Sequence, residues 1–237
     1  MPLSTLQRVG VAGIRAFARM FVRRISLQTE GMHNVPETGP VVLAARHYHQ
    51  VYDGIALLST MPRPVHLVIS VDWARNYAHR VALHGLAYLA AWPVLLRSER
   101  VIQSAHKPTA PRSVFQPEEV HSYRRICLQQ CDDLLCDGRM VAMFPEGYPN
   151  IDSHDSPKTA PGEFLPFRPG FVWIAQAAAQ RLGHPIPVVP VGFVYRREKR
   201  WSAVMRFGSP YQVASSSETD VVVAEIEARV RTLCVPA

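Results

Sequence analysis

Short apolar runs alternate with helical patterns along most of the chain, and this alternation restricts the fold to a few layouts. Strand-length runs lie at 25–30, 41–45, 65–71, 93–96, 140–144 and 186–195. Helical patterns lie at 52–60, 73–91, 121–137, 170–182 and 221–233. Strands that alternate with helices predict an α/β domain with a mixed, largely parallel sheet flanked by helices. The 237 residues, of which 48% are hydrophobic, suffice for a single domain of this kind.

Two segments interrupt the alternation. Residues 104–119 and 149–169 are rich in Pro, Ser, Thr and charged residues, so each is predicted to be a long loop. Each comes directly after a group of candidate site residues. Loops of this length inside a compact domain usually carry function or move.

Residues 3–25 form a pattern of their own. Apolar side chains recur at helical spacing among five arginines, and the segment contains no acidic residue. The pattern predicts a basic amphipathic helix, a unit at 1–25 ahead of a main domain at 26–237. Such a helix can lie on an anionic membrane, where each basic residue near the lipid contributes about 1 kcal/mol. It can also pack on the domain's own core and turn its arginines to solvent, and the two readings are compatible.

The charge balance is basic, with 26 Lys and Arg against 19 Asp and Glu, a formal charge of +7 that favours anionic partners. Nucleic acid is not expected among them, because no recognition module with interleaved basic and aromatic residues is present. Four cysteines without C-x-x-C spacing indicate reduced thiols in a cytosolic setting. No transmembrane helix is predicted, since the apolar stretch 81–96 is broken and shorter than the roughly 20 residues that span a bilayer.

The segment 47–54 reads H-Y-H-Q-V-Y-D-G and directly follows the apolar run 41–45. A strand that delivers imidazoles and a carboxylate to a loop can build a general base, because the Asp fixes the His tautomer and stabilises the imidazolium. His49 and Asp53 would be i, i+4 neighbours on a regular helix, whereas His47 lies nearer the strand end. Both histidines are therefore candidates for the base.

From residue 30 to about 195 the order of motifs resembles the PlsC-type glycerolipid acyltransferases, the family of 1-acylglycerol-3-phosphate acyltransferases. The segment 30–36, E-G-M-H-N-V-P, is similar to the family's "veGlenlP", and four blocks fall in the family's order. In the first block the family has four residues between His and Asp. Here five residues separate His47 from Asp53 and three separate His49 from it. Alignment to the strand gives His47 the family's His position, so we expect His47 as base, Asp53 as its orienting partner and His49 as the alternative.

The second and third blocks imply contacts to the acceptor substrate. P-V-L-L-R at 93–97 is similar to the family's short strand that ends in Arg, which implies that Arg97 binds the acceptor's phosphate. F-P-E-G at 144–147 matches the family's F-P-E-G-T-R-S up to the glycine and then departs from it. The resemblance implies that Glu146 and Gly147 shape the acceptor site.

The last matching segments complete the set. Arg168 stands where the family has Lys in F-K-x-G, and it is a candidate to replace the basic residue missing from the third block. The fourth block, 187–192, resembles an apolar strand of the family with a Pro near its end, and this strand is expected to line the acyl-chain site.

The resemblance implies transfer of a fatty acyl group from acyl-CoA or acyl carrier protein to a hydroxyl of a lysophospholipid or related acceptor. The thioester already carries its leaving group, so no metal, cofactor or prosthetic group is expected. A water-insoluble product and the basic N-terminal helix favour a cytoplasmic protein that is peripheral on the inner face of a membrane with an anionic surface.

Two alternatives remain at this stage. His47-x-His49 after a strand is superficially similar to the H-x-H-x-D-H cluster of metallo-β-lactamase-type hydrolases, which would make His47, His49 and Asp53 metal ligands. In that cluster the Asp follows directly, whereas Asp53 comes later. The irregular His/Asp interval also allows a catalytically silent homologue that binds membranes or phosphate.

Overall fold

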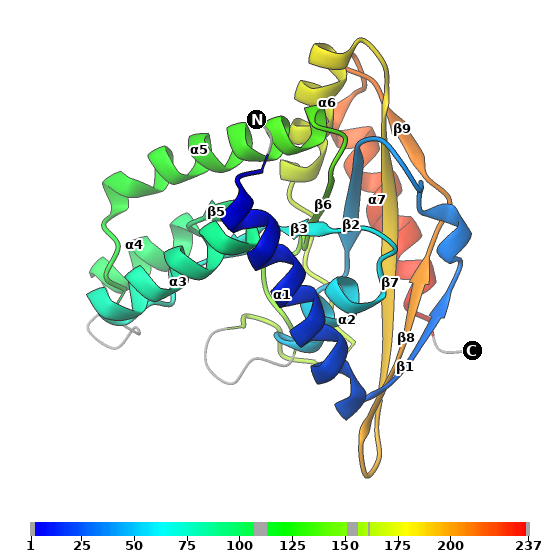
Figure 1. Cartoon of the computed structure of the whole chain (residues 1–237), viewed down its shortest axis with the longest axis horizontal. Helices are drawn as coiled ribbons and strands as arrows, with labels where there is room; N and C mark the ends of the chain where they lie inside the picture. The colour runs from blue at the N-terminus through cyan, green and yellow to red at the C-terminus, as the bar shows by residue number, and fades with distance from the viewer. Residues whose placement is uncertain (1–2, 107–112, 151–155, 161, 236–237) are drawn as a thin grey trace.

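The computed structural model describes residues 3–106, 113–150, 156–160 and 162–235. Figure 1 shows a central sheet with helices on both faces. The strand order is β1-β8-β7-β2-β6-β3, with β9 paired to β7. The strands are β1 Ser26–Glu30, β2 Val41–Ala45, β3 Val65–Leu67, β6 Met140–Met143, β7 Ile186–Arg197, β8 Trp201–Phe207 and β9 Tyr211–Val213. Strand β7 pairs antiparallel with β8 and β9, while the other pairs along this path are parallel. The predicted α/β class with a mixed, largely parallel sheet is confirmed.

Helices cover both faces of strand β2. The helices in the described part of the chain are α1 Thr5–Phe21, α2 Tyr52–Thr60, α3 Tyr77–Ala90, α4 Ser98–His106, α5 Pro117–Cys136, α6 Gly170–Leu182 and α7 Thr219–Leu233, with short 3-10 turns at Val22–Arg24 and Met32–Asn34. Val42 and Ala44 pack with α5, α6 and α7, whereas Leu43 and Ala45 pack with α1 and α2. Every β2 residue is fully buried, which is why this strand reads as a continuous apolar run.

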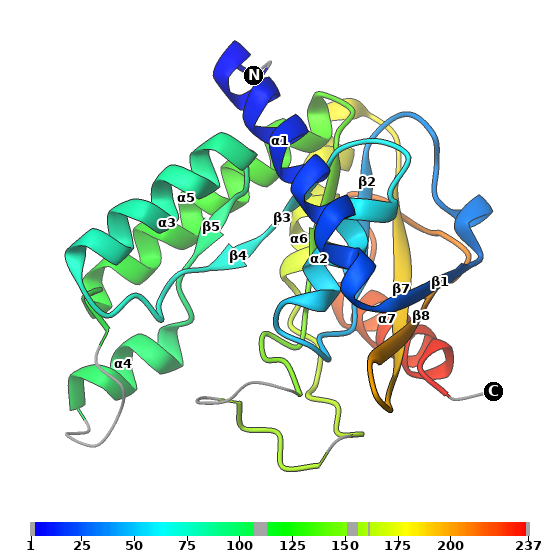
Figure 2. The ribbon, with the colours of Figure 1, turned by 60° about the horizontal axis from the view of Figure 1, so that its bottom comes forward.

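A small second sheet lies beside the main one. Strand β4, Ile69–Ser70, pairs in parallel with β5, Val94–Leu95. Around it Val71, Leu96 and Phe115 form a separate core cluster. Figure 2 shows α3, α4 and α5 gathered with these strands into a lobe on one side of the main sheet. This lobe forms one wall of the site described below.

Helix α1 packs on α2 and α3. Ala18 is fully buried, and Gly10 approaches α3 so closely that a Cβ there would lie 2.4 Å from the Leu89 carbonyl oxygen. A capping box formed by Ser4 and Gln7 begins the helix. The predicted helix thus packs on the domain, while large apolar side chains on its other side remain exposed, namely Leu6, Val9, Phe17 and Met20. Its contact with a membrane stays a prediction.

Several predicted elements differ from the structure. The run 65–71 divides at Val68, whose N–H donates to the Ala142 carbonyl at 2.8 Å, so β3 stays in the main sheet and β4 enters the second. Residues 104–106 belong to α4 rather than to a loop. Helix α5 begins at Pro117 instead of 121, because a proline suits the first helical position and needs no N–H partner.

The remaining differences concern the C-terminal third and the long loops. Strands β8 and β9 were not predicted, although Ala203, Met205 and Phe207 show the buried alternation of a strand. Of the two predicted loops, 107–112, 151–155 and 161 lie outside the described residues. The described parts of 149–169 contain neither helix nor strand, as predicted.

Candidate active site

His47 and Asp53 meet where the chain passes from β2 into α2. His47 lies two residues beyond the end of β2, and Asp53 lies in the first turn of α2. The Nδ1 of His47 is 2.9 Å from Oδ2 of Asp53. Because a carboxylate can only accept, Nδ1 carries the hydrogen and Nε2 keeps its lone pair. The imidazole stacks on the Phe144 ring with centroids 4.3 Å apart, which fixes its plane.

Asp53 is fully buried and is surrounded by hydrogen-bond donors. Its Oδ2 accepts from His47 Nδ1 and from the backbone N–H groups of Tyr48 and His49, at 2.7 and 2.9 Å. Its Oδ1 accepts from the Tyr195 hydroxyl at 2.7 Å. Burial and the neighbouring Asp53 carboxylate hold the pKa of Tyr195 well above its usual range, so this hydroxyl remains a donor. The extra residue in the His/Asp interval is accommodated by a turn whose amides wrap around the carboxylate.

The ring of His49 bonds the backbone at the start of α2. Its Nδ1 accepts a long hydrogen bond from the Tyr52 N–H at 3.4 Å, and the ring lies edge-on to Trp201. Burial lowers the pKa of His49, and the Asp53 carboxylate opposes that shift. It is the backbone N–H of His49, rather than its ring, that bonds Asp53. The structure therefore brings His47, and not the His49 ring, against the carboxylate.

The F-P-E-G turn at 144–147 follows β6. Its two predicted site residues, Glu146 and Gly147, lie in different surroundings. Gly147 has φ of 75°, in the left-handed region that favours glycine, and it borders a cleft. Glu146 is 1% exposed and turns inward. Its carboxylate accepts from the His47 N–H at 3.0 Å and from the Leu165 N–H at 3.1 Å. Gly147 thus borders the cleft, whereas the Glu146 carboxylate lies behind His47.

Arg97 connects the second sheet to this turn. Its Nε and Nη2 lie 3.1 and 2.8 Å from Oδ2 of the fully buried Asp72, and its Nη1 donates to the Gly147 carbonyl at 3.1 Å. Burial alone would lower the pKa of Arg97, but the Asp72 carboxylate outweighs it and the pKa is raised. The guanidinium also covers the Tyr148 ring at 4.4 Å from its centroid. Arg97 borders the cleft and is already paired on two sides.

Arg168 lies on the other side of Gly147 and is half exposed. Its Nη2 is 2.6 Å from Glu99 Oε1, which also accepts the Tyr148 hydroxyl at 3.0 Å. Burial would raise the pKa of Glu99, yet the hydrogen bond from Arg168 produces a net decrease. Burial raises the pKa of Tyr148 to about 12. Arg168 is therefore a half-exposed cation at the cleft whose carboxylate partner, Glu99, is itself partly exposed.

A cleft of about 1180 Å³ runs between the main sheet and the lobe, with His47 in its wall. Its walls are largely apolar and include Ile55, Leu58, Leu83, Leu86, Leu128 and Trp173. Five arginines border it, whereas no Asp or Glu of the described residues does. The volume exceeds the roughly 300–1,000 Å³ of ordinary ligand pockets. A long apolar ligand with an anionic group matches this lining.

The fourth predicted block lies elsewhere. Residues 187–192 belong to β7, which pairs with β2 on the side opposite β6 and the lobe. Val188, Val189 and Val191 are fully buried in the sheet and its helices, and they do not border the cleft. This strand is a core strand that β2 and β6 separate from β3, so it does not border the cleft, and its contact with an acyl chain stays a prediction.

Among the described residues, no cluster of three or more His, Cys, Asp and Glu side chains has the arrangement of a metal site. Within the same part of the chain, no helix combines the length and apolar character needed to cross a bilayer.

The His47–Asp53 pair thus lies at a strand end of an α/β sheet, in the wall of a cleft with apolar walls and five bordering arginines. The chain belongs to the Acyltransferase family, whose model matches residues 26–194. The family predicted from the motif order is thus confirmed.

A solved structure gives the same fold. The crystal structure of the 1-acyl-sn-glycerophosphate (LPA) acyltransferase PlsC from Thermotoga maritima is 15% identical and superposes with a TM-score of 0.59. The match covers 95% of this chain and 78% of that one. No curated protein sequence matches the chain significantly.

Three residues of the site were not predicted from sequence. Asp72 neutralises Arg97, Tyr195 holds Asp53, and Lys158 reaches the His47 loop with its Nζ 3.0 Å from the His47 carbonyl oxygen. Asp72 follows a predicted strand, a position that is typical of site residues in α/β sheets and that was available as a signal. Tyr195 and Lys158 carry no comparable signal, because their partners are far away in the sequence.

Proposed function

We propose that this protein is a glycerolipid O-acyltransferase in which His47 is the general base. The observation that carries the proposal is the His47–Asp53 pair, with an Nδ1 to Oδ2 distance of 2.9 Å, in the wall of the cleft. Since Nδ1 donates to Asp53, Nε2 is the nitrogen that takes the proton from an acceptor hydroxyl. Asp53 orients the ring and stabilises the imidazolium that forms.

The proposed reaction needs a thioester and a hydroxyl. The acceptor oxygen attacks the thioester carbonyl carbon while its proton passes to Nε2 of His47. The C–S bond then breaks, and the thiolate leaves with the proton that His47 returns. General-base assistance of this kind is typically worth about 10²- to 10⁴-fold. Acyl-CoA and acyl carrier protein both supply such a thioester, and no metal or prosthetic group is required for the steps as written.

The cleft lining supports an acceptor with a phosphate and an acyl chain, such as a lysophospholipid. Arg168 is the proposed anion ligand, because it is half exposed and an arriving phosphate can replace Glu99 as its partner. Arg97, whose charge Asp72 neutralises, keeps the Gly147 carbonyl in place. The apolar walls between α2, α3, α5 and α6 provide room for acyl chains.

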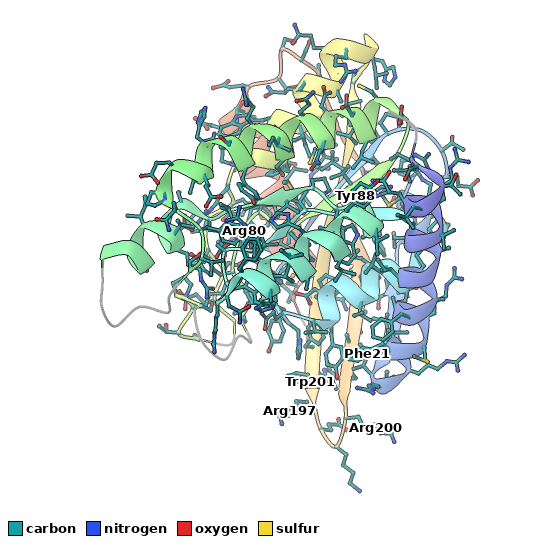
Figure 3. All side chains as sticks on the ribbon, turned by 60° about the vertical axis from the view of Figure 1, so that its left-hand side comes forward. Phe21, Arg80, Tyr88, Arg197, Arg200 and Trp201 are labelled. Atoms are coloured by element: carbon teal, nitrogen blue, oxygen red, sulfur yellow. The ribbon has the colours of Figure 1, made fainter. Side chains whose placement is uncertain are left out.

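A peripheral position on the cytoplasmic face of an anionic membrane belongs to the same proposal. The exposed apolar stripe of α1 lies on the side of the helix away from α2 and α3. The β7–β8 hairpin adds four basic residues against one acidic residue at 196–200, and Figure 3 shows Arg197 and Arg200 at its projecting tip. Ser26 pairs with Ser202 close to the turn of the hairpin, so the end of α1 and the hairpin tip are neighbours. Apolar and basic groups on adjacent elements are the pattern of membrane-surface proteins.

The decisive experiment measures acyl transfer from acyl-CoA and from acyl carrier protein to a panel of lysophospholipids. His47→Ala should lower kcat by about 10²- to 10⁴-fold. His49→Ala should cost much less, and the exposed His184→Ala serves as a matched control that should not change activity. A protein inactive with every donor and acceptor, or one indifferent to His47→Ala, would contradict the proposal and favour a silent homologue.

Membrane attachment has its own test, co-sedimentation with vesicles of phosphatidylcholine alone or mixed with phosphatidylglycerol. Binding should require the anionic lipid and should weaken with salt. Replacing Arg197, Lys199 and Arg200 together by Gln should weaken it by roughly 100-fold, since each basic residue near the surface contributes about 1 kcal/mol. Equal binding to both vesicle types would rule out the electrostatic part of the proposal.

A further inference from the structure

Both backbone polar groups of His47 are held by one buried ion pair. Oε1 of Glu146 accepts the N–H of His47 at 3.0 Å, and Nζ of Lys158 donates to the His47 carbonyl oxygen at 3.0 Å. The two side chains meet each other at 2.6 Å, between Lys158 Nζ and Glu146 Oε2, and both are fully buried. A closed ring of contacts therefore grips the peptide groups on either side of the His47 side chain.

Lys158 reaches this position from the segment that follows the F-P-E-G turn, where the chain departs from its family's T-R-S. Its Nζ also donates to Oδ1 of Asn150 at 3.1 Å. Three oxygens thus surround an ammonium group that has three donors. Asn150 in turn donates to the Glu163 carbonyl at 3.0 Å, which ties the loop to itself. The segment that differs from the family motif therefore supplies its own polar contacts behind His47.

The energetics indicate a role beyond stability. Burial lowers the pKa of Lys158, and the Glu146 carboxylate opposes that shift. Buried ion pairs of this kind seldom stabilise a fold more than apolar side chains of similar volume, because desolvation offsets the attraction. Lys158 does not border the cleft, so its contact is with His47 and not with a substrate. What the pair does provide is a fixed position for the peptide that carries the imidazole.

We propose that Lys158, acting with Glu146, is a positioning residue that fixes the main chain of His47 so that Nε2 stays aligned with the acceptor hydroxyl. This inference rests on the proposed role of His47 as base. Removing the ammonium leaves the Glu146 charge buried without its partner and the His47 carbonyl unpaired, so the loop relaxes. Misplacing a reacting group by about 1 Å can cost about 10²-fold in rate.

The test compares Lys158→Met in the wild-type protein and in the His47→Ala variant, measuring kcat and KM for acyl transfer on the full chain. We expect kcat to fall by about 10- to 100-fold in the wild-type background, with KM changed less than about threefold. In the His47→Ala background the same substitution should have no further effect. Ile226→Ala, a core truncation on α7, is the control, because it lowers stability without touching the His47 loop.

Equal losses in both backgrounds would show that Lys158 does not act through His47, and an unchanged kcat would show that it does not act at all; either overturns the inference. Should Lys158→Met fail to fold, the pair Lys158→Met with Glu146→Gln removes both charges together. That pair should recover stability but not kcat, and recovery of wild-type kcat would overturn the inference. If His47→Ala itself is fully active, the proposed base is wrong, a result distinct from failure of the Lys158 contact alone.

Discussion

Replacing Asp53 by Asn separates the charge of this carboxylate from its hydrogen bonds. The Asn oxygen can occupy the place of Oδ2 and accept from His47 and from the two amides, while the NH₂ group faces Tyr195. The Tyr195 hydroxyl can rotate and accept from that group, because a hydroxyl both donates and accepts. The contacts then survive and the negative charge is lost. Asp53→Ala instead removes the acceptor for every one of these donors.

The two substitutions should therefore differ in stability more than in activity. A buried donor left unsatisfied costs about 1–3 kcal/mol. Asp53→Ala strands two backbone N–H groups and the Tyr195 hydroxyl, so we expect a loss of about 3 kcal/mol or more, from a total stability on the order of 5–15 kcal/mol. Asp53→Asn should cost less than about 1.5 kcal/mol. Both should lower kcat by about 10²-fold or more, because neither stabilises the His47 imidazolium.

Urea unfolding followed by circular dichroism measures the first quantity, and steady-state acyl transfer measures the second. The Asn variant should unfold close to the wild-type midpoint and remain slow. If it is as unstable as the Ala variant, the charge rather than the hydrogen bonds holds the loop. If it keeps the wild-type kcat, the carboxylate charge has no part in catalysis, and the proposed stabilisation of the His47 imidazolium by Asp53 is refuted.

Three further predictions concern stability. His66 is fully buried with a pKa lowered to about 4 by desolvation, so the unfolded chain binds its proton first as pH falls below 6.5. Protonation of His66 should therefore lower the free energy of unfolding by about 2 kcal/mol between pH 7 and 4.5. His66→Gln should remove this part of the pH dependence, measured by urea unfolding at each pH. Asp72→Asn leaves the buried Arg97 cation without its counter-ion and should cost about 3–5 kcal/mol, measured by the same unfolding, with substantial recovery when Arg97 is also replaced by Met. Gly147→Ala places a Cβ at an ordinary 3.6 Å from Arg168 Cζ, so the expected loss of about 1–2 kcal/mol comes from the left-handed backbone; a loss near zero would show that the turn adapts.

The helices and strands whose bounds were predicted best are those that depend on the order of apolar and polar residues within the element itself. The predicted boundaries of β2, α2 and α6 coincide with the structure at 41–45, 52–60 and 170–182. Strand β2 is buried on both faces and so consists of consecutive apolar residues. Helix α6 ends at Leu182, and Gly183 directly after it adopts the left-handed conformation typical of a helix C-terminus. A strand buried on both faces and a helix that ends before a glycine can both be recognised from the local sequence.

The parts of the site that could not be predicted depend on contacts between distant segments. Lys158 and His47 are 111 residues apart, and Tyr195 and Asp53 are 142 residues apart. A lysine in a Pro- and Ser-rich loop is usually solvated, and a tyrosine at a strand end usually packs at a surface. Neither residue type therefore indicates a contact with the His–Asp pair. The choice between His47 and His49 likewise depended on the turn between β2 and α2, whose course no spacing rule supplied.

The way the amides of Tyr48 and His49 close around Asp53 has a consequence for how related proteins are found. Asp53 lies at the start of its helix and accepts hydrogen bonds from the amides of the preceding loop. These bonds orient the loop toward the carboxylate, and they do not require a fixed number of intervening residues. An inserted residue can then be taken up in the turn while the imidazole still arrives at the same oxygen. Searches that demand a fixed count between the histidine and the aspartate will pass over such chains, whereas a search for a buried helix-entry carboxylate that faces a strand-end histidine will find them.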